Sequence, residues 1–277
     1  LQSSAQLEFW ETFEFSEIQN SLGEANLYLS RKNGYEEDTI NLIADSLLSE
    51  QQLQEKYKKR NPLFFVLTPN IRTNENGDQV IPPGPVIGYT LLKDTSTFNT
   101  YIEDPEFMSN FDSDVKFALA FDPGDPTKER FAVIALKSKG NNGYVMDGSV
   151  ISDAAQVLDN GVVKVSMNMN ADGTGIWRAT TGNNIDRSVA IVLDGYVKSW
   201  PTVNDEIPNG RSEISGNFTV NEGKDLANVL KSGKMPAPAH IVQEAVIGPS
   251  LGQDSIDSGL KSFVIALCIV LLYMIFY

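Results

Sequence analysis

The fold is decided by residues 162–231, VVKVSMNMNADGTGIWRATTGNNIDRSVAIVLDGYVKSWPTVNDEIPNGRSEISGNFTVNEGKDLANVLK. Strands are predicted where apolar and polar residues alternate, and helices where the apolar residues are three to four positions apart. The Asp194-Gly195 pair favours a tight hairpin turn, because glycine accepts a positive φ. The predicted elements are a strand at 162–169, a helix at 172–181, strands at 188–193, 196–200 and 212–218, and a helix at 221–231.

A further strand is expected at Ile241–Ile247, after this stretch. The order strand, helix, strands, helix, strand is the split βαβ pattern of a ferredoxin-like sandwich. In the helix at 172–181, Asp172 is expected to cap the first turn by accepting backbone N–H groups. The sequence therefore predicts an α+β chain with a ferredoxin-like domain in its later half.

The first half of the chain is less regular. It is punctuated by Pro-Gly and Asn-Gly turns and has no clear repeat, which favours one irregular α+β unit over roughly 32–150. We expect strands at 5–13, 63–67, 86–92, 115–121 and 131–136, and helices at 16–31, 38–60 and 98–111.

The last fifteen residues carry no charge. FVIALCIVLLYMIFY at 263–277 is apolar on every side, whereas a core helix is usually amphipathic. We therefore expect a transmembrane helix that the end of the chain truncates. The first residue is Leu1 and no signal peptide follows it, so the chain is expected to be a piece of a longer protein. Only Lys261 flanks the span, so no basic signal holds the acidic body in the cytoplasm.

Composition excludes several kinds of function. The net charge is −14, which leaves no basic face for nucleic acid. His240 is the one histidine and Cys268 the one cysteine, so a catalytic triad or a zinc site has few residues to draw on. We predict no catalytic residues, no cofactor and no metal. Asp122, Asp125 and Glu129 suggest a calcium loop, but a solvated hairpin turn is favoured because their spacing is not that of an EF-hand.

Two motif clusters go beyond turn chemistry. The first is NGRSEISGNF at 209–218, followed by a helix and SGKMPAP at 232–238. The second is EAVIGPSLGQDSI at 244–256, which leads into the apolar helix. Together they resemble the SecD family, or the SecD half of a fused SecDF, which is an accessory subunit of the bacterial Sec protein translocase. The matching residues that we take as structural or hinge positions are Gly210, Arg211, Ser215, Gly216, Phe218, Gly248, Pro249, Ser250, Leu251 and Gly252.

The resemblance implies a first periplasmic domain followed by the second transmembrane helix. It implies a base formed by 1–30 and 151–250, an inserted head at 31–150, and a membrane-entry and transmembrane segment at 251–277. The implied role is late preprotein translocation driven by the proton motive force. The implied location is the bacterial inner membrane, with residues 1–250 on the periplasmic side. The implied partners are SecF, separate or fused, the SecYEG channel, YajC, YidC, unfolded preprotein and the lipid bilayer.

Two other functions were weighed. A membrane-tethered hydrolase would need a pair of carboxylates in a cleft with one raised pKa. A membrane-tethered extracytoplasmic interaction or adhesion module would fit a parent gene that ends at Tyr277. Neither accounts for the motifs at 209–256.

Overall fold

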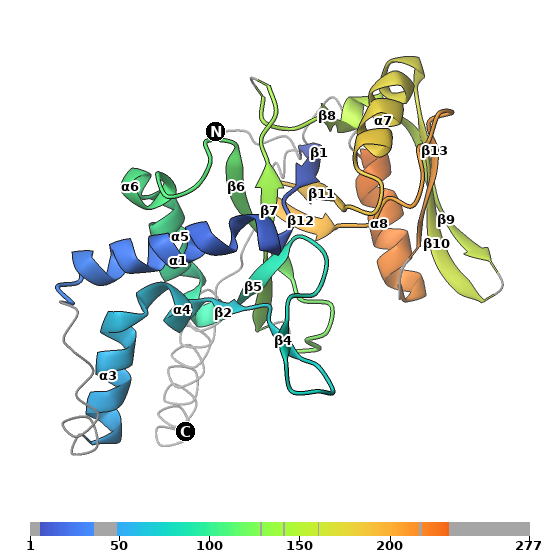
Figure 1. The fold of residues 1–277 in the computed structure, drawn as a ribbon. Coiled ribbons are helices and arrows are strands. Elements are labelled where there is room, and N and C mark those ends of the chain that lie inside the picture. Colours follow the sequence, from blue (N-terminus) through green and yellow to red (C-terminus); the bar gives the residue numbers. More distant parts are fainter. Residues whose placement is uncertain are drawn as a thin grey trace, which may run out of the picture. The chain divides into compact units, whose positions relative to one another are not determined.

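Residues 6–35, 49–127, 129–140, 142–159, 161–215 and 218–232 are described by the computed structural model, and all of them belong to one unit, Leu1–Pro238. Their elements are labelled in Figure 1. The helices are α1 (Phe15–Lys32), α3 (Glu50–Arg60), α4 (Pro62–Val66), α5 (Thr95–Glu103), α6 (Pro105–Met108), α7 (Ala171–Asn183) and α8 (Val220–Ser232). The strands are β1 (Leu7–Thr12), β2 (Thr68–Pro69), β3 (Arg72–Thr73), β4 (Gln79–Val80), β5 (Val86–Leu91), β6 (Val115–Phe121), β7 (Arg130–Lys137), β8 (Met146–Asp147), β9 (Ile151–Asp159), β10 (Val162–Met169), β11 (Val189–Leu193), β12 (Tyr196–Ser199) and β13 (Arg211–Ser215).

Five strands of the larger sheet form a closed ring. Strand β1 pairs with β11, β11 with β12, β12 with β6, β6 with β7, and β7 with β1. The β12–β6 contact is parallel and the other four are antiparallel. Strand β5 also pairs with β7, along the first half of β7 and on the side that faces away from β6. The ring thus joins β1, from the start of the described chain, to strands far along the sequence.

The inside of the ring is filled by one buried aromatic side chain and by aliphatic side chains both small and large. Trp10 is almost fully buried there, together with Ala120, Ala132 and Ala190. Successive side chains of a strand point to opposite faces, so every second residue of these strands belongs to this core. The remaining side chains point outward and form two further cores.

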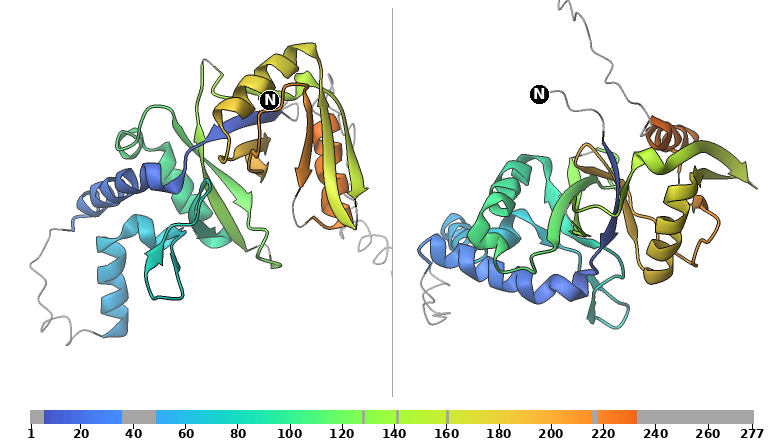
Figure 2. Two further views of the ribbon diagram at one scale, coloured as in Figure 1. Left: turned by 45° about the vertical axis from the view of Figure 1, so that its right-hand side comes forward. Right: turned by 90° about the horizontal axis from the view of Figure 1, so that it is seen from above.

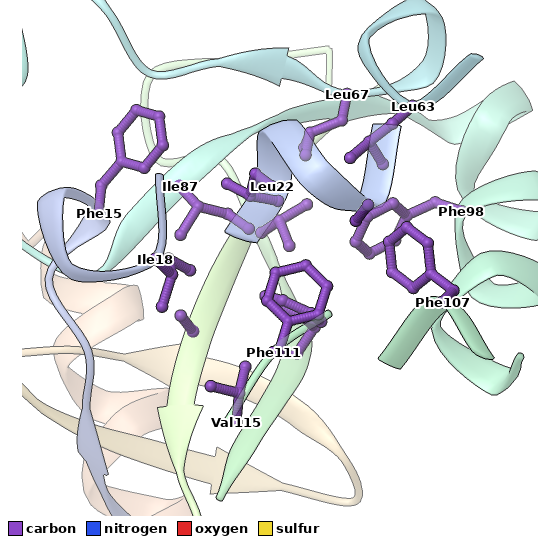
Figure 3. Close-up of a cluster of buried hydrophobic side chains, with 14 of the residues drawn as sticks. Phe15, Ile18, Leu22, Leu63, Leu67, Ile87, Phe98, Phe107, Phe111 and Val115 are labelled. Carbon is purple, nitrogen blue, oxygen red and sulfur yellow. The ribbon is translucent and has the colours of Figure 1, made fainter. Parts of the chain in front are cut away.

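The first outer core lies under helices α1, α4, α5 and α6. Helix α1 buries Ile18, Leu22, Ala25 and Leu29, which recur at the spacing of a helix face. They meet the outward residues of β5, β6 and β7 and the phenylalanines of α5 and α6, as the close-up in Figure 3 shows. This core lies within the irregular unit that the sequence predicts for 32–150, together with α1.

The second outer core lies between the ring and a three-stranded sheet of order β13-β10-β9. Leu7 and Phe9 of β1 contribute to it from the ring side. Helix α8 packs along the long β9–β10 hairpin, as both views in Figure 2 show. The approach is close, because a Cβ on Gly223 would lie 2.5 Å from Cγ1 of Val163. Glycine is thus required where α8 crosses β10.

Three details of the sequence prediction are corrected. Residues 63–66 of the strand predicted at 63–67 lie in helix α4, because Pro62 takes the first helical position, where its missing N–H costs nothing. The cap of α7 is Asn170, whose side chain accepts from the Gly173 N–H at 2.9 Å, rather than Asp172. Strand β9 was not predicted at all.

The elements expected to build a single ferredoxin-like sheet divide between two sheets. Strands β10 and β13 pair with each other, while β11 and β12 belong to the ring. The reason is that β11 finds its partner in β1, which is nearly two hundred residues away in sequence. The α+β class is confirmed.

Other predicted elements lie outside the described residues. They are the first part of the helix at 38–60, the strand at 241–247 and the transmembrane helix at 263–277. Among the helices that the structure does describe, none is both long and apolar enough to cross a membrane.

Candidate functional site

Strand β13 carries the first half of the NGRSEISGNF motif and lies at the edge of its sheet. It pairs with β10 on one side, and no described strand pairs with its other side. Its side chains alternate, with Ser212 and Ile214 buried and Arg211, Glu213 and Ser215 exposed. The motif therefore presents one face to the core and one to solvent.

Gly210 has a structural role. Its φ is +66°, a region that other residues rarely adopt, and an added Cβ would lie 2.3 Å from Oγ1 of Thr174 in α7. Its carbonyl accepts a hydrogen bond from the N–H of Met169 at 2.8 Å, which starts the β10–β13 ladder. The glycine thus lets β13 begin directly against the first turn of α7.

Arg211 and Ser215 share the exposed face of this sheet. The backbone N–H of Arg211 donates to the side chain of Asn209 at 3.1 Å, but its guanidinium forms no ion pair with a described residue. The sequence leaves two roles for Arg211, a structural clamp and a direct substrate contact. Among the described residues the guanidinium forms no such clamp. Phe218 is half-buried against the second outer core. Gly216 and the GPSLG segment at 248–252 lie outside the described residues.

A cavity of about 210 Å³ adjoins β13. Its apolar wall includes Trp177 of α7, Val189 of β11 and Ile207 of the loop before β13. Ser212 fixes the indole, whose Nε1–H donates to its hydroxyl at 2.7 Å, and Phe9 meets the same ring edge-on at 5.6 Å between centroids. The wall is thus held in place by a hydrogen bond and by aromatic packing.

The same cavity is bordered by three consecutive residues, Ser212, Glu213 and Ile214. Neighbouring side chains of a strand point to opposite faces, so a cavity on one face would meet only every second residue. Contact with all three brings the cavity up to the backbone of β13. This feature could not be found from the sequence, because it depends on which strand lies at the edge.

The rim of the cavity is acidic. Glu213 and Asp205 both line it and both are exposed. The Glu213 carboxylate lies 3.4 Å from the Lys164 ammonium, which Asp159 also contacts at 2.7 Å. The pKa of Lys164 is raised, first by its hydrogen bond to Asp159 and then by Glu213. Asp205 has no ion-pair partner among the described residues.

The loop between β6 and β7 is a capped turn. The Asp125 side chain accepts hydrogen bonds from the N–H groups of Thr127, Glu129 and Arg130. The hydrogen bond from the Thr127 hydroxyl, together with these backbone bonds, lowers the pKa of Asp125. Asp122 pairs with Arg130. In the described residues, no group of three His, Cys, Asp or Glu side chains is placed to hold a metal ion.

The chain matches a family model described as "SecDF, P1 head subdomain" over residues 128–237. This range covers β7 to α8 and includes the whole cavity wall. It lies mostly within the part that the sequence analysis assigned to the base, whereas that analysis expected the head at 31–150.

The relatives are protein translocase subunits SecD. That of Rhodothermus marinus is 36% identical over 236 residues, which is 84% of this chain and 35% of the relative. That of Magnetococcus marinus is 29% identical over 272 residues, 95% of this chain and 48% of the relative. That of Calditerrivibrio nitroreducens is 42% identical over 113 residues, 41% of this chain and 22% of the relative. The chain thus spans between a fifth and a half of the length of these three relatives.

Two solved structures of SecDF were also found. One, a translocon-associated membrane protein from Thermus, gives a TM-score of 0.41 at 20% identity over 99% of this chain and 35% of that one. The other, a membrane component that enhances protein export, gives 0.32 at 17% identity over 86% of this chain and 100% of that one. Superpositions this loose add nothing to the assignment, which rests on the sequence relatives and the family model. The chain belongs to the SecD family of protein translocase subunits.

Proposed function

We propose that this chain is part of an accessory subunit of the Sec translocase, which assists late preprotein translocation driven by the proton motive force. The relatives named protein translocase subunit SecD support this, since the alignment with one of them runs over 84% of the chain. In this role the protein binds and moves polypeptide rather than catalysing a chemical step. Its partners are then SecF, the SecYEG channel, YajC and YidC, together with unfolded preprotein.

The location follows from the same assignment. Residues 1–250 lie on the periplasmic side of the inner membrane, and 251–277 lead into a transmembrane helix of a multi-pass protein. The absence of a basic flank before that helix agrees with this orientation. Single cysteines at Asn141 and Asp254 should react with an impermeant thiol reagent in intact spheroplasts. Protection of both until lysis would reverse the orientation.

The subdivision that we favour differs from the one inferred from the sequence. The lobe formed by β9, β10, β13, α7 and α8 packs on the second outer core and falls within the range matched by the head model. We therefore assign the head to this lobe and the base to the ring. A ferredoxin-like base at 151–250 remains an expectation from the sequence. The part of 32–150 outside the ring strands β6 and β7 is then an elaboration on the ring.

One observation favours preprotein contact by this lobe: an apolar cavity lies against β13, whose outer side pairs with no strand among the described residues. Unfolded preprotein offers both apolar side chains and free backbone groups. A photo-crosslinking residue at Asp205 of the full-length protein should therefore capture a stalled export intermediate. The same residue at Glu75, in the β3–β4 turn, is the matched control. Equal capture at both positions, or none at Asp205, would refute contact by this lobe.

A further inference from the structure

The backbone groups on the outer edge of β13 can be identified. Met169 donates to the Gly210 carbonyl, and in an antiparallel ladder the residues that bond to the partner strand alternate with those that face away. Ser212 and Ile214 therefore bond to β10, which leaves the N–H and C=O of Glu213 and Ser215 on the outer side. No backbone hydrogen bond joins either residue to a described residue beyond β10.

The cavity lies against the stretch of β13 that carries these outward groups. Glu213, whose N–H and C=O point outward, lines it between its two neighbours. Backbone polar groups at a partly enclosed site need a hydrogen-bond partner, because leaving them unpaired away from water costs free energy. A strand laid along β13 would supply that partner.

The size of the cavity limits which group of a ligand can enter it. Its volume of 210 Å³ is below the range of about 300–1,000 Å³ that is typical of small-molecule sites. The wall of Trp177, Val189 and Ile207 suits one bulky apolar side chain. The acidic rim of Glu213 and Asp205, in a chain of net charge −14, favours a basic residue beside that side chain.

From these three features we infer that an extended polypeptide adds to the edge of β13 as a further strand. One apolar side chain enters the cavity, and a neighbouring lysine or arginine meets Glu213 and Asp205. Backbone pairing gives affinity with little demand on sequence, as in other cases of strand addition. The inference deepens the proposed function, on which it rests, since a translocase must hold many unrelated unfolded chains.

A peptide and its N-methylated twin test the inference. The probe is a nine-residue peptide with a central leucine, threonine and valine alternating on each side, and a lysine at each end. Its binding to the full chain is measured by titration, together with hydrogen exchange of the β13 amides. The expected result is saturable binding with slowed exchange at Glu213. Methylation of the peptide's central backbone nitrogens should weaken binding at least tenfold, because it removes the pairing groups and keeps the side chains.

Two variants at one position separate backbone from side chain. Glu213→Pro removes the outward N–H and leaves the ladder to β10 intact, since proline is accepted on strand edges. It should weaken peptide binding at least tenfold. Glu213→Ala keeps the N–H and removes only the carboxylate, so it should weaken binding several-fold less than Glu213→Pro does. If the proline variant misfolds, the N-methylated peptide still gives the answer with the unaltered chain.

The outcomes distinguish this inference from the proposed function. Equal binding of the methylated peptide, or unchanged binding by Glu213→Pro, would overturn strand addition while preprotein contact by the lobe stands. Slow exchange at Glu213 without peptide, and no change with it, would also overturn it, because the edge would then be covered within the chain. Normal export in cells that lack the whole protein would instead refute the proposed function.

Discussion

The guanidinium of Arg187 donates two hydrogen bonds to the carboxylate of Glu17, at 2.6 and 3.1 Å, across 170 residues of sequence. Arg187 precedes β11, and Glu17 lies in the first turn of α1. A third bond reaches the carbonyl of Thr12 at 3.2 Å. The same carboxylate accepts from the N–H of Glu14 at 2.7 Å as part of a capping box. This one pair thus fixes the point at which the chain leaves the ring and enters α1.

Breaking this pair should destabilise the fold modestly. Arg187→Met removes the paired charge, and because both side chains are about a third exposed we expect a loss of about 1 kcal/mol rather than the larger values of buried pairs. Urea unfolding of the two proteins measures it. The control is Arg178→Met, which breaks a more exposed pair with Glu206 and should cost less than about 0.5 kcal/mol. Equal losses would show that the Arg187 pair has no special part in holding α1.

The contribution of the pair should depend on pH in one direction. Burial raises the pKa of Glu17, but the hydrogen bonds from Arg187 and the Glu14 backbone outweigh it, and the net pKa lies below its ordinary value of 4.5. A carboxyl with a lowered folded pKa contributes its full stability above its unfolded pKa and loses it as the pH falls through the folded value. The stability difference between the natural chain and Arg187→Met should therefore be constant near neutral pH and shrink below pH 4.5. A difference that stays unchanged in acid would contradict this.

Replacing Gly210 should be costly for two separate reasons. Gly210→Ala forces a Cβ into a positive φ and against the Thr174 hydroxyl at 2.3 Å. We expect a loss of roughly 2–4 kcal/mol, since backbone strain of about 1–3 kcal/mol adds to the steric clash. Gly140→Ala is the matched control, because its φ is +64° but nothing lies within 4 Å. It should show the strain alone. Thermal unfolding of both variants would separate the terms, and similar losses would mean that Thr174 moves aside.

The interior of the ring should resist larger side chains. Ala132 is 1% exposed and packs in the core that holds Trp10. Ala132→Leu should cost about 1–3 kcal/mol, because a packed core cannot accept three extra carbons without displacing its neighbours. Ala155→Leu, on the exposed face of β9, should be close to neutral. A tolerated leucine at 132 would mean that the ring opens or carries unfilled space.

Local signals predicted most elements but not their partners. The alternation in 162–169 and the Asp194-Gly195 turn gave strands that the structure confirms, and Asp194 adopts φ +52° and Gly195 φ +82° as a primed turn needs. Strand β9 was missed, although Asn160-Gly161 is the kind of pair that joins two hairpin strands. The pairing of β1 with β11 and the closed ring could not be foreseen, because both depend on contacts between distant segments.

The site was predicted only in part for the same reason. The motif was found, but which strand forms an edge is a property of the sheet and not of the strand. The cavity combines β13 with Trp177 and Val189, which no local pattern connects. Six of the ten chosen motif residues, Gly216 and Gly248 to Gly252, lie outside the described part and keep the status of predictions.

The GPSLG segment, 248–252, is predicted to be a mechanical joint between the domain and the membrane. Gly248 and Gly252 offer backbone freedom, while Pro249 fixes its own φ near roughly −65°. A domain that swings during translocation needs a pivot close to the bilayer that bends without unfolding it. Gly248→Ala together with Gly252→Ala should then leave folding and insertion intact but slow secretion and weaken proton coupling in the full-length protein.

Two comparisons make this prediction decisive. Gly175→Ala, at an uncrowded position in α7, is the matched control and should leave secretion unchanged. The unfolding curve must be the same in all three proteins, because a strained glycine would lower stability without any hinge. Normal secretion by the folded, inserted double variant would rule the joint out. Slowed secretion with unchanged stability would show that the two alanines act by removing backbone freedom at 248 and 252.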